Sequence, residues 1–166
     1  MHYARQDTLS PNDCLIVGAL EDAALSKKLP LKALHPLQHS LKKSNDLRVQ
    51  TNPDSTSFLL VHCGAQASYT QEKLLKYLKT CFSFLATQTF AQVTFAFPPL
   101  PTHAPDDQLA LMVQQIDALC YQLNEFKTDA KTLPFTHINF FLPGATDKGL
   151  HTGKIMAEAL RFTRYL

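Results

Sequence analysis

The sequence has no tryptophan, only 5 glycines among its 166 residues, and no excess of one charge. Its 16 Lys and Arg residues nearly balance its 14 Asp and Glu residues, which leaves a formal net charge of +2. Such a balance gives no argument for a nucleic acid or a membrane as the main partner. With 45% hydrophobic and 18% charged residues, the composition excludes a disordered chain, collagen and a coiled coil.

Paired cysteines and a targeting segment are also lacking. The four cysteines form no CxxC motif and each lies in an apolar run, so we predict reduced, buried thiols. Residues 1–7 contain no apolar segment typical of a secretory signal. The uncharged stretch 80–105 is interrupted by polar residues and by Pro98-Pro99, which does not suit a membrane span. We therefore expect a cytoplasmic protein.

Short apolar runs bounded by turn residues predict the strands of a sheet. Asn52-Pro53-Asp54-Ser55 is a turn signal, so the strands on either side of it are expected to pair as a hairpin. The last predicted strand ends at Pro143-Gly144. The predicted strands cover residues 14–17, 47–51, 57–63, 92–97 and 135–142.

Apolar residues at helical spacing predict four helices between and after these strands. The clearest covers residues 71–88, and the others cover 31–43, a segment opening at Asp106-Asp107, and a segment from about Asp147 to the last residue. Strands joined by such helices pair in parallel through right-handed crossovers. We therefore predict a three-layer α/β sandwich with a mixed, mostly parallel sheet and helices on both faces.

A nucleotide-binding loop is the first chemistry to test in an α/β protein. Residues 144–149 have the glycine spacing of a P-loop after a strand, but Leu150 and His151 follow where Lys and Ser or Thr are required. We interpret the segment as a turn that leads into a helix. The GxGxxG and GxSxG motifs are absent.

Histidine and carboxylate pairs give no stronger site. His35 and His39 are four residues apart but lack the Glu of an HExxH motif and a third ligand, so surface histidines are the preferred interpretation. His62 and Cys63 are adjacent on a strand and point to opposite faces, which favours His62 as a hydrogen-bonded core or edge histidine. For Asp106-Asp107, N-capping of a helix is favoured over acid–base chemistry.

Nucleophiles and basic patches were weighed in the same way. Cys63, before Gly64, is the one cysteine whose context would suit a lowered pKa, and we favour a structural role for it. A solvated helix face explains a basic cluster better than phosphate contact does. That cluster comprises Lys27, Lys28, Lys32, Lys42, Lys43 and Arg48. No catalytic, cofactor-binding or metal-binding residue is assigned.

Five segments of the chain carry a resemblance to a known family. Residues 13–18 form an apolar strand that ends at a glycine, and residues 58–64 form a strand that runs into a glycine-ended loop. The helix with Glu72 to Lys76, the stretch 121–128 before the last strand, and the helix 155–166 follow in that order. Together these segments resemble the N-terminal domain of the leucyl aminopeptidase (cytosol aminopeptidase) family, which is macro-domain-like. The resemblance covers nearly the whole chain.

The resemblance implies a function for a longer protein. Members of the family are two-metal exopeptidases, with Mn or Zn, that release N-terminal residues from peptides as homohexamers. The two metals would lie in a C-terminal domain, where they would polarise the scissile carbonyl and activate a water molecule. The NTDAEGR signature of that domain is absent here, and Thr128-Asp129-Ala130 is assigned no role. We therefore expect these 166 residues to be inactive alone and to have the C-terminal catalytic domain as partner.

The predicted organisation follows from this resemblance. Residues 1–146 are expected to form an accessory domain, and residues 147–166 the start of a helix that leads to the catalytic domain, absent from this chain. The apolar stripe of that helix should pass from the core of this domain onto the next; it comprises Ile155, Met156, Ala159, Leu160, Thr163 and Leu166. The alternative is a free-standing macro-like module that binds ADP-ribose or a nucleotide.

Overall fold

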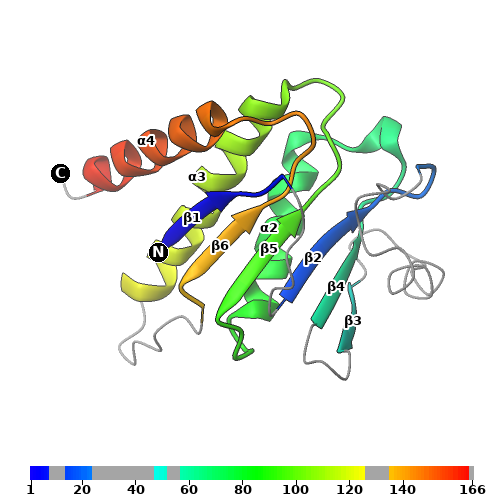
Figure 1. Cartoon of the computed structure of the whole chain (residues 1–166), viewed down its shortest axis with the longest axis horizontal. Helices are drawn as coiled ribbons and strands as arrows, with labels where there is room; N and C mark the ends of the chain where they lie inside the picture. Colours follow the sequence, from blue (N-terminus) through cyan, green and yellow to red (C-terminus); the bar gives the residue numbers. More distant parts are fainter. Residues whose placement is uncertain (8–13, 24–46, 52–56, 126–134, 165–166) are drawn as a thin grey trace.

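The fold is an α/β sandwich built on one sheet (Figure 1). A computed structural model describes residues 1–7, 14–23, 47–51, 57–125 and 135–164. Six strands form the sheet in the order β1-β6-β5-β2-β4-β3. All neighbouring strands are parallel except β3 and β4, which are antiparallel. The strands are β1 (His2–Arg5), β2 (Cys14–Ala19), β3 (Leu47–Thr51), β4 (Ser57–His62), β5 (Gln92–Ala96) and β6 (His137–Phe140).

The central strands are buried on both faces because their sequences are almost entirely apolar. Every residue of β2 and of β4 is buried. Every second residue of these strands, for example Ile16, Leu59 and Phe95, belongs to one core cluster. The same cluster contains residues of the helices 71–85 and 105–125. Leu15, Val17 and Leu60 alternate with them and are buried on the other face.

Helix α2 (Gln71–Leu85) shows how a sequence stripe becomes a core face. Thr70 caps its first turn, with the side-chain oxygen accepting from the backbone N–H of Lys73 at 3.4 Å. A 3-10 turn, η1 (Gln66–Ser68), precedes it. Most of its large apolar residues are buried, while Leu75 and Phe84 are only partly buried. The buried residues are Leu74, Tyr77, Leu78, Cys81, Phe82 and Leu85.

Helices α3 (Pro105–Glu125) and α4 (Asp147–Arg164) complete the described layer. Figure 1 shows α2 and α3 behind the sheet and α4 lying across α3 beside the edge strand β1. Tyr3 and Arg5 of β1 reach α3 and α4 by side-chain hydrogen bonds. The first strand is therefore joined to the last helix through the edge of the sheet.

Most of the predicted elements are confirmed. The hairpin forms as predicted, the sheet is mostly parallel, and three of the predicted helices are α2, α3 and α4. The helix predicted over 31–43, and with it the second helical layer, lies outside the described residues. Strand β1 was not predicted, because the sequence His-Tyr-Ala-Arg carries no apolar alternation and only Tyr3 packs against the core.

The prediction for the apolar stripe of α4 is wrong in one respect. Its residues Ile155, Met156 and Leu160 are exposed rather than packed in the core of this domain. The buried face of α4 instead consists of Gly149, Gly153 and Ala157. A Cβ at Gly153 would lie 2.9 Å from the Cα of Ala110 and 2.8 Å from the Cβ of Val113, both on α3. Small residues let the two helices approach so closely that the larger ones must face outward.

Among the helices of the described residues, none combines the length and the apolarity needed to cross a bilayer.

Candidate functional site

The cysteines are confirmed as buried free thiols. Burial raises the pKa of the Cys63 thiol to about 12, and that of Cys120 also to about 12. A thiol with such a pKa is protonated at neutral pH and is a poor nucleophile. The structure therefore supports a packing role for Cys63, whose sulfur lies where a Cβ on Gly18 would be only 3.0 Å away.

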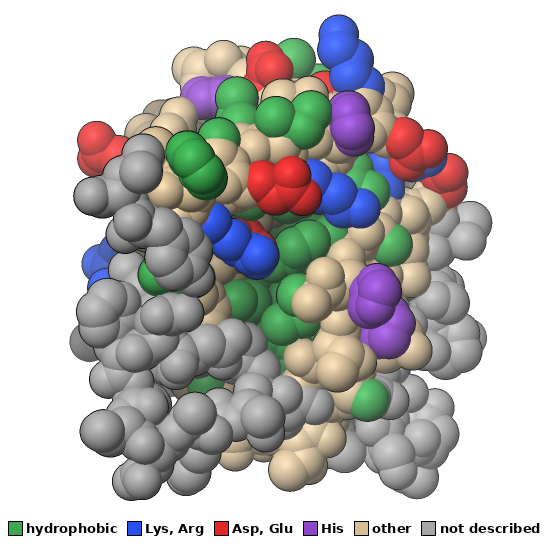
Figure 2. All heavy atoms as spheres, turned by 90° about the vertical axis from the view of Figure 1, so that its left-hand side faces the viewer, with side chains coloured by type: hydrophobic (Ala, Val, Ile, Leu, Met, Phe, Trp, Pro, Cys, Tyr) green, Lys and Arg blue, Asp and Glu red, His purple; other side chains and the backbone are tan. Residues whose placement is uncertain are grey.

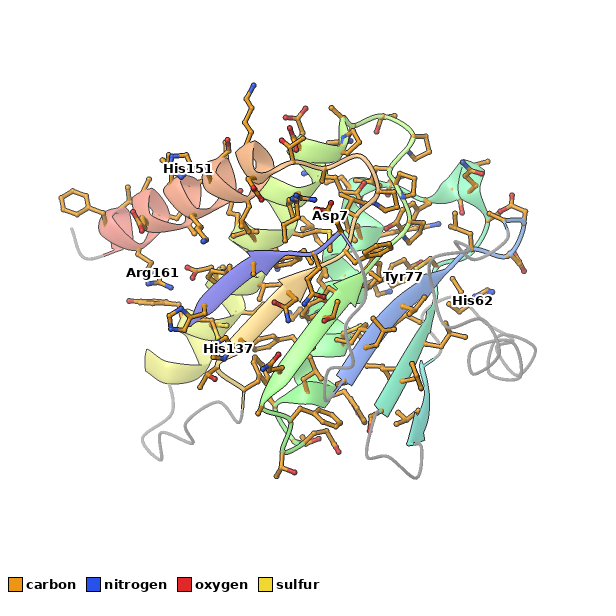
Figure 3. All side chains as sticks on the ribbon, in the orientation of Figure 1. Asp7, His62, Tyr77, His137, His151 and Arg161 are labelled. Atoms are coloured by element: carbon orange, nitrogen blue, oxygen red, sulfur yellow. The ribbon has the colours of Figure 1, made fainter. Side chains whose placement is uncertain are left out.

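His62 lies at the carboxyl end of β4, as Figure 3 shows, and is 8% exposed. The prediction of a buried histidine is confirmed. The prediction that its ring is fully hydrogen-bonded is wrong for the part of the chain that the structure describes, because the Nδ1 atom has no partner there. Cys63 packs in the hydrophobic core cluster. Neighbouring residues of an extended strand point to opposite faces, so His62 and Cys63 are not placed to share one ion.

Asp106 has a different role from the N-cap predicted for it. Helix α3 begins at Pro105, so Asp106 lies inside the first turn. Its Oδ1 atom accepts from the backbone N–H of Thr146 at 2.6 Å, and its Oδ2 atom accepts from the Thr146 hydroxyl at 2.9 Å. These bonds lower the pKa of the Asp106 carboxyl. Asp106 thus fixes the segment that leads into α4 rather than capping its own helix.

The segment 144–149 is confirmed as a turn that leads into a helix. Gly144 has a φ of +84°, which favours glycine, and α4 begins at Asp147. His35, His39 and the lysines at 27, 28, 32, 42 and 43 lie outside the described residues. Arg48 lies on β3, where only the backbone is described.

The candidate site is a hollow of about 240 Å³ between β1, α3 and α4. Figure 2 shows this face of the molecule, with hydrophobic side chains in the floor and acidic and basic side chains along the rim. Figure 3 places Arg161 and His137 on the same side of the molecule. The lining residues are Met1, His2, Tyr3, Asp117, Lys154, Ala157, Glu158 and Arg161.

A buried carboxylate anchors one wall of this hollow. The Asp117 side chain is 3% exposed, and its Oδ1 atom accepts from the Tyr3 hydroxyl at 2.8 Å. The Nε atom of Arg161 donates to Oδ2 at 2.8 Å, and Nη2 of the same guanidinium donates to Oδ1. Residues from β1, α3 and α4 therefore meet at one carboxylate.

The charges of this cluster are fixed by its contacts. The hydrogen bonds that Arg161 donates to Asp117 raise the pKa of the guanidinium. Burial raises the pKa of Tyr3, and the nearby Cys120 and Asp117 raise it further. The phenol therefore stays protonated and donates to Asp117, and the buried charge is compensated by the guanidinium.

Sequence reasoning missed this cluster because no local motif links its members. Tyr3 and Asp117 are 114 residues apart, and Asp117 and Arg161 are 44 apart. The one available signal was an acidic residue inside the apolar stripe of α3, next to Ile116. A charged residue in such a position needs a partner when the helix packs.

Within the described residues, no group of three or more His, Cys, Asp or Glu side chains could hold a metal ion.

A family model for the cytosol aminopeptidase family, N-terminal domain, matches residues 16–130. That range covers more than half of the chain, and the sheet described above lies largely within it. The chain therefore belongs to the cytosol aminopeptidase family, in which it corresponds to the N-terminal domain.

Particular relatives agree with this assignment. Two probable cytosol aminopeptidases of Legionella pneumophila, strains Paris and Corby, are each 32% identical over 177 aligned positions. The alignments cover 100% of this chain but only 36% of each relative. This chain thus spans about a third of the length of the curated relatives it matches.

Solved structures show the same fold. A mutant of tomato leucine aminopeptidase matches with a TM-score of 0.69 at 16% identity, over 94% of this chain and 35% of that one. The bottromycin maturation enzyme BotP in complex with Mn matches with a TM-score of 0.63 at 12% identity, over 89% and 30%. The predicted resemblance to the N-terminal domain of leucyl aminopeptidases is confirmed.

Proposed function

We propose that this chain is the non-catalytic N-terminal domain of a longer aminopeptidase that releases N-terminal residues from peptides. The observation that carries the proposal is that the whole chain aligns with 36% of relatives named probable cytosol aminopeptidase. The catalytic residues, and the two divalent metals, Mn or Zn, would then belong to the remaining part. The nucleotide-binding alternative has no support in these comparisons.

Activity measurements test this proposal directly. We expect no hydrolysis of leucine p-nitroanilide by the 166-residue chain with added Mn²⁺ or Zn²⁺. A polypeptide that carries this domain together with the rest of the encoded enzyme should hydrolyse it and lose activity with a chelator. Metal-dependent turnover by the short chain, after a control for contaminating peptidases, would contradict the proposal, as would an inactive long polypeptide.

The exposed face of α4 supplies the surface for contact with the catalytic domain. Ile155 is 53% exposed and Phe162 is 67% exposed, and Met156 and Leu160 lie beside them on the helix. Covering these outward apolar residues with another apolar surface lowers the free energy. We propose that this face packs against the remainder of the longer enzyme.

Cysteine labelling tests the contact, because the native thiols are buried. An Ile155→Cys variant of the short chain should react rapidly with a thiol reagent, and the same variant of the long polypeptide should react slowly. A Lys76→Cys variant, on the exposed side of α2, is the matched control and should react rapidly in both. Equal labelling of Ile155→Cys in both polypeptides would remove α4 from the interface.

The assembly and location of the longer enzyme are part of the same proposal. We expect a cytoplasmic homohexamer, with this domain attached to each catalytic domain, and we expect weak, non-specific binding of DNA at most. The name of the relatives, cytosol aminopeptidase, supports the location. Light scattering of the long polypeptide measures the assembly, and a monomer at micromolar concentration would contradict the hexamer.

A further inference from the structure

Two charged side chains that line the hollow between β1, α3 and α4 have no partner among the residues that the structure describes. Lys154 and Glu158 both line it, on one side of α4. They are four residues apart, a spacing at which Lys and Glu side chains often pair. In the described part of the chain neither side chain forms an ion pair or a hydrogen bond. Among the side chains that line the hollow, Lys154 thus offers a cation and Glu158 an anion for a ligand, and Met1, which carries the α-ammonium group, lines it as well.

Two further charged side chains, Asp117 and Arg161, line the hollow. Asp117 is already bound by Tyr3 and by Arg161, so it adds no free negative charge. The guanidinium of Arg161 carries five N–H donors, more than Asp117 uses, and its side chain is 43% exposed. Arg161 and Lys154 both line the hollow from α4.

Size and polarity restrict the ligand further. The volume of about 240 Å³ is below the range of roughly 300–1,000 Å³ for pockets that hold drug-sized molecules. The lining includes the apolar side chains of Ala157 and Met1. Figure 2 shows hydrophobic side chains within the hollow on this face of the molecule. A simple anion would meet Lys154 and Arg161 but would be repelled by Glu158. A simple cation would be attracted by Glu158 but repelled by Lys154 and Arg161.

We propose that the hollow binds a free α-amino acid with an apolar side chain. Its carboxylate pairs with Lys154 and the remaining N–H donors of Arg161, and its ammonium group pairs with Glu158. Its side chain lies on the apolar floor beside Ala157 and the ring of Tyr3. Charge-assisted hydrogen bonds of this kind are the strong ones in a partly enclosed site. The proposal concerns the short chain alone and does not depend on peptidase activity.

L-Leucine is the probe, added to the 166-residue chain and followed by amide chemical shifts. A ligand of this size is expected to bind with a dissociation constant of about 1 mM. We expect saturable shifts confined to β1, the middle of α3 and residues 154–161 of α4. Two analogues separate the charges: 4-methylpentanoic acid lacks the ammonium group, and 3-methylbutylamine lacks the carboxylate. Each should bind at least about tenfold more weakly than leucine.

Variants tie the binding to the two free charges. Lys154→Met and Glu158→Gln should each weaken leucine binding about tenfold. Lys148→Met is the matched control, since Lys148 is exposed on the same helix and does not line the hollow. If Lys154→Met fails to fold, as judged by circular dichroism, Lys154→Gln replaces it.

Three results would overturn the proposal. The first is no binding of leucine at concentrations up to ~20 mM, well above the expected constant. The second is equal binding of leucine and 4-methylpentanoic acid, or of inorganic phosphate, which would make the hollow a plain anion site. The third is full leucine affinity in both Lys154→Met and Glu158→Gln.

Discussion

Helices α2 and α4 orient their large apolar residues in opposite ways. Helix α2 buries most of its large apolar residues against the sheet, with Leu78 fully buried. Helix α4 turns Gly149, Gly153 and Ala157 inward and leaves Ile155 and Phe162 in contact with solvent. An apolar stripe in a sequence therefore indicates a helix, but it does not indicate which surface will cover the stripe.

The two helices are also held differently. Helix α2 depends on apolar burial against the sheet, which is roughly proportional to area and needs no specific partner. Helix α4 is attached by close contact of small residues with α3 and by polar contacts at both ends. Those polar contacts are Arg161 with Asp117, Thr146 with Asp106, and Arg5 with Asp147.

The largest effect should come from truncating the core of α2. Leu78→Ala is expected to lower the free energy of unfolding by about 3 kcal/mol, because Leu78 is 0% exposed and its removal leaves a cavity. Leu160→Ala on α4 is the matched control and should lower it by less than about 1 kcal/mol. Urea unfolding of both variants measures the difference. Equal losses would mean that the outward face of α4 is covered in solution.

The next effect should come from the polar attachment of α4. Arg161→Met is expected to lower the free energy of unfolding by about 2 kcal/mol, because it leaves the Asp117 carboxylate buried without its cation. Adding Asp117→Asn should restore part of the loss, since the buried charge is then gone. A double-mutant cycle in urea measures the coupling. Additive losses would show that the pair does not fasten α4 to α3.

A smaller effect is expected where the two helices touch. Gly153→Ala improves helix propensity by about 1 kcal/mol, yet we expect a net loss of about 1 kcal/mol because the new methyl group meets Ala110 and Val113. Ala159→Gly, on the exposed side of α4, is the control and should cost roughly 0.5–1 kcal/mol from propensity alone. Thermal unfolding of both variants measures the two costs. Stabilisation by Gly153→Ala would show that α4 lies further from α3.

The smallest effect is a pH dependence at the start of α4. The Thr146 N–H and hydroxyl lower the pKa of the Asp106 carboxyl in the folded protein. The folded state therefore binds the proton less readily than the unfolded state, so this contribution is present at higher pH. It is lost as the pH falls below about 4, through the lowered pKa.

Asp106→Asn tests this sign. The melting temperature of the variant should lie below that of the parent above about pH 5, and the difference should shrink as the pH approaches 3. Asp107→Asn, in the same turn of α3, controls for the effect of the helix dipole on an acidic residue. A difference that is constant down to pH 3 would contradict the role of the Thr146 contact.

The candidate site could not be predicted from the sequence, although most of the fold could. Apolar periodicity indicated β2, β4, β5, α2 and α3, because it shows which residues of one segment are buried on the same face. Strand β1 and the Tyr3–Asp117–Arg161 cluster carry no such pattern. They exist only because residues 114 and 44 positions apart meet across the edge of the sheet.

The sequence by itself determined the class of the protein: an α/β domain with a hairpin, buried thiols and the segments of a known family. Three features depend on the tertiary structure and could not be predicted from the sequence: the face of α4 that is covered, the helix that Asp106 supports, and the position of the hollow. The physical reason is that burial of an apolar stripe is a property of one segment, whereas the fit of Gly153 on Ala110 depends on two helices at a fixed distance.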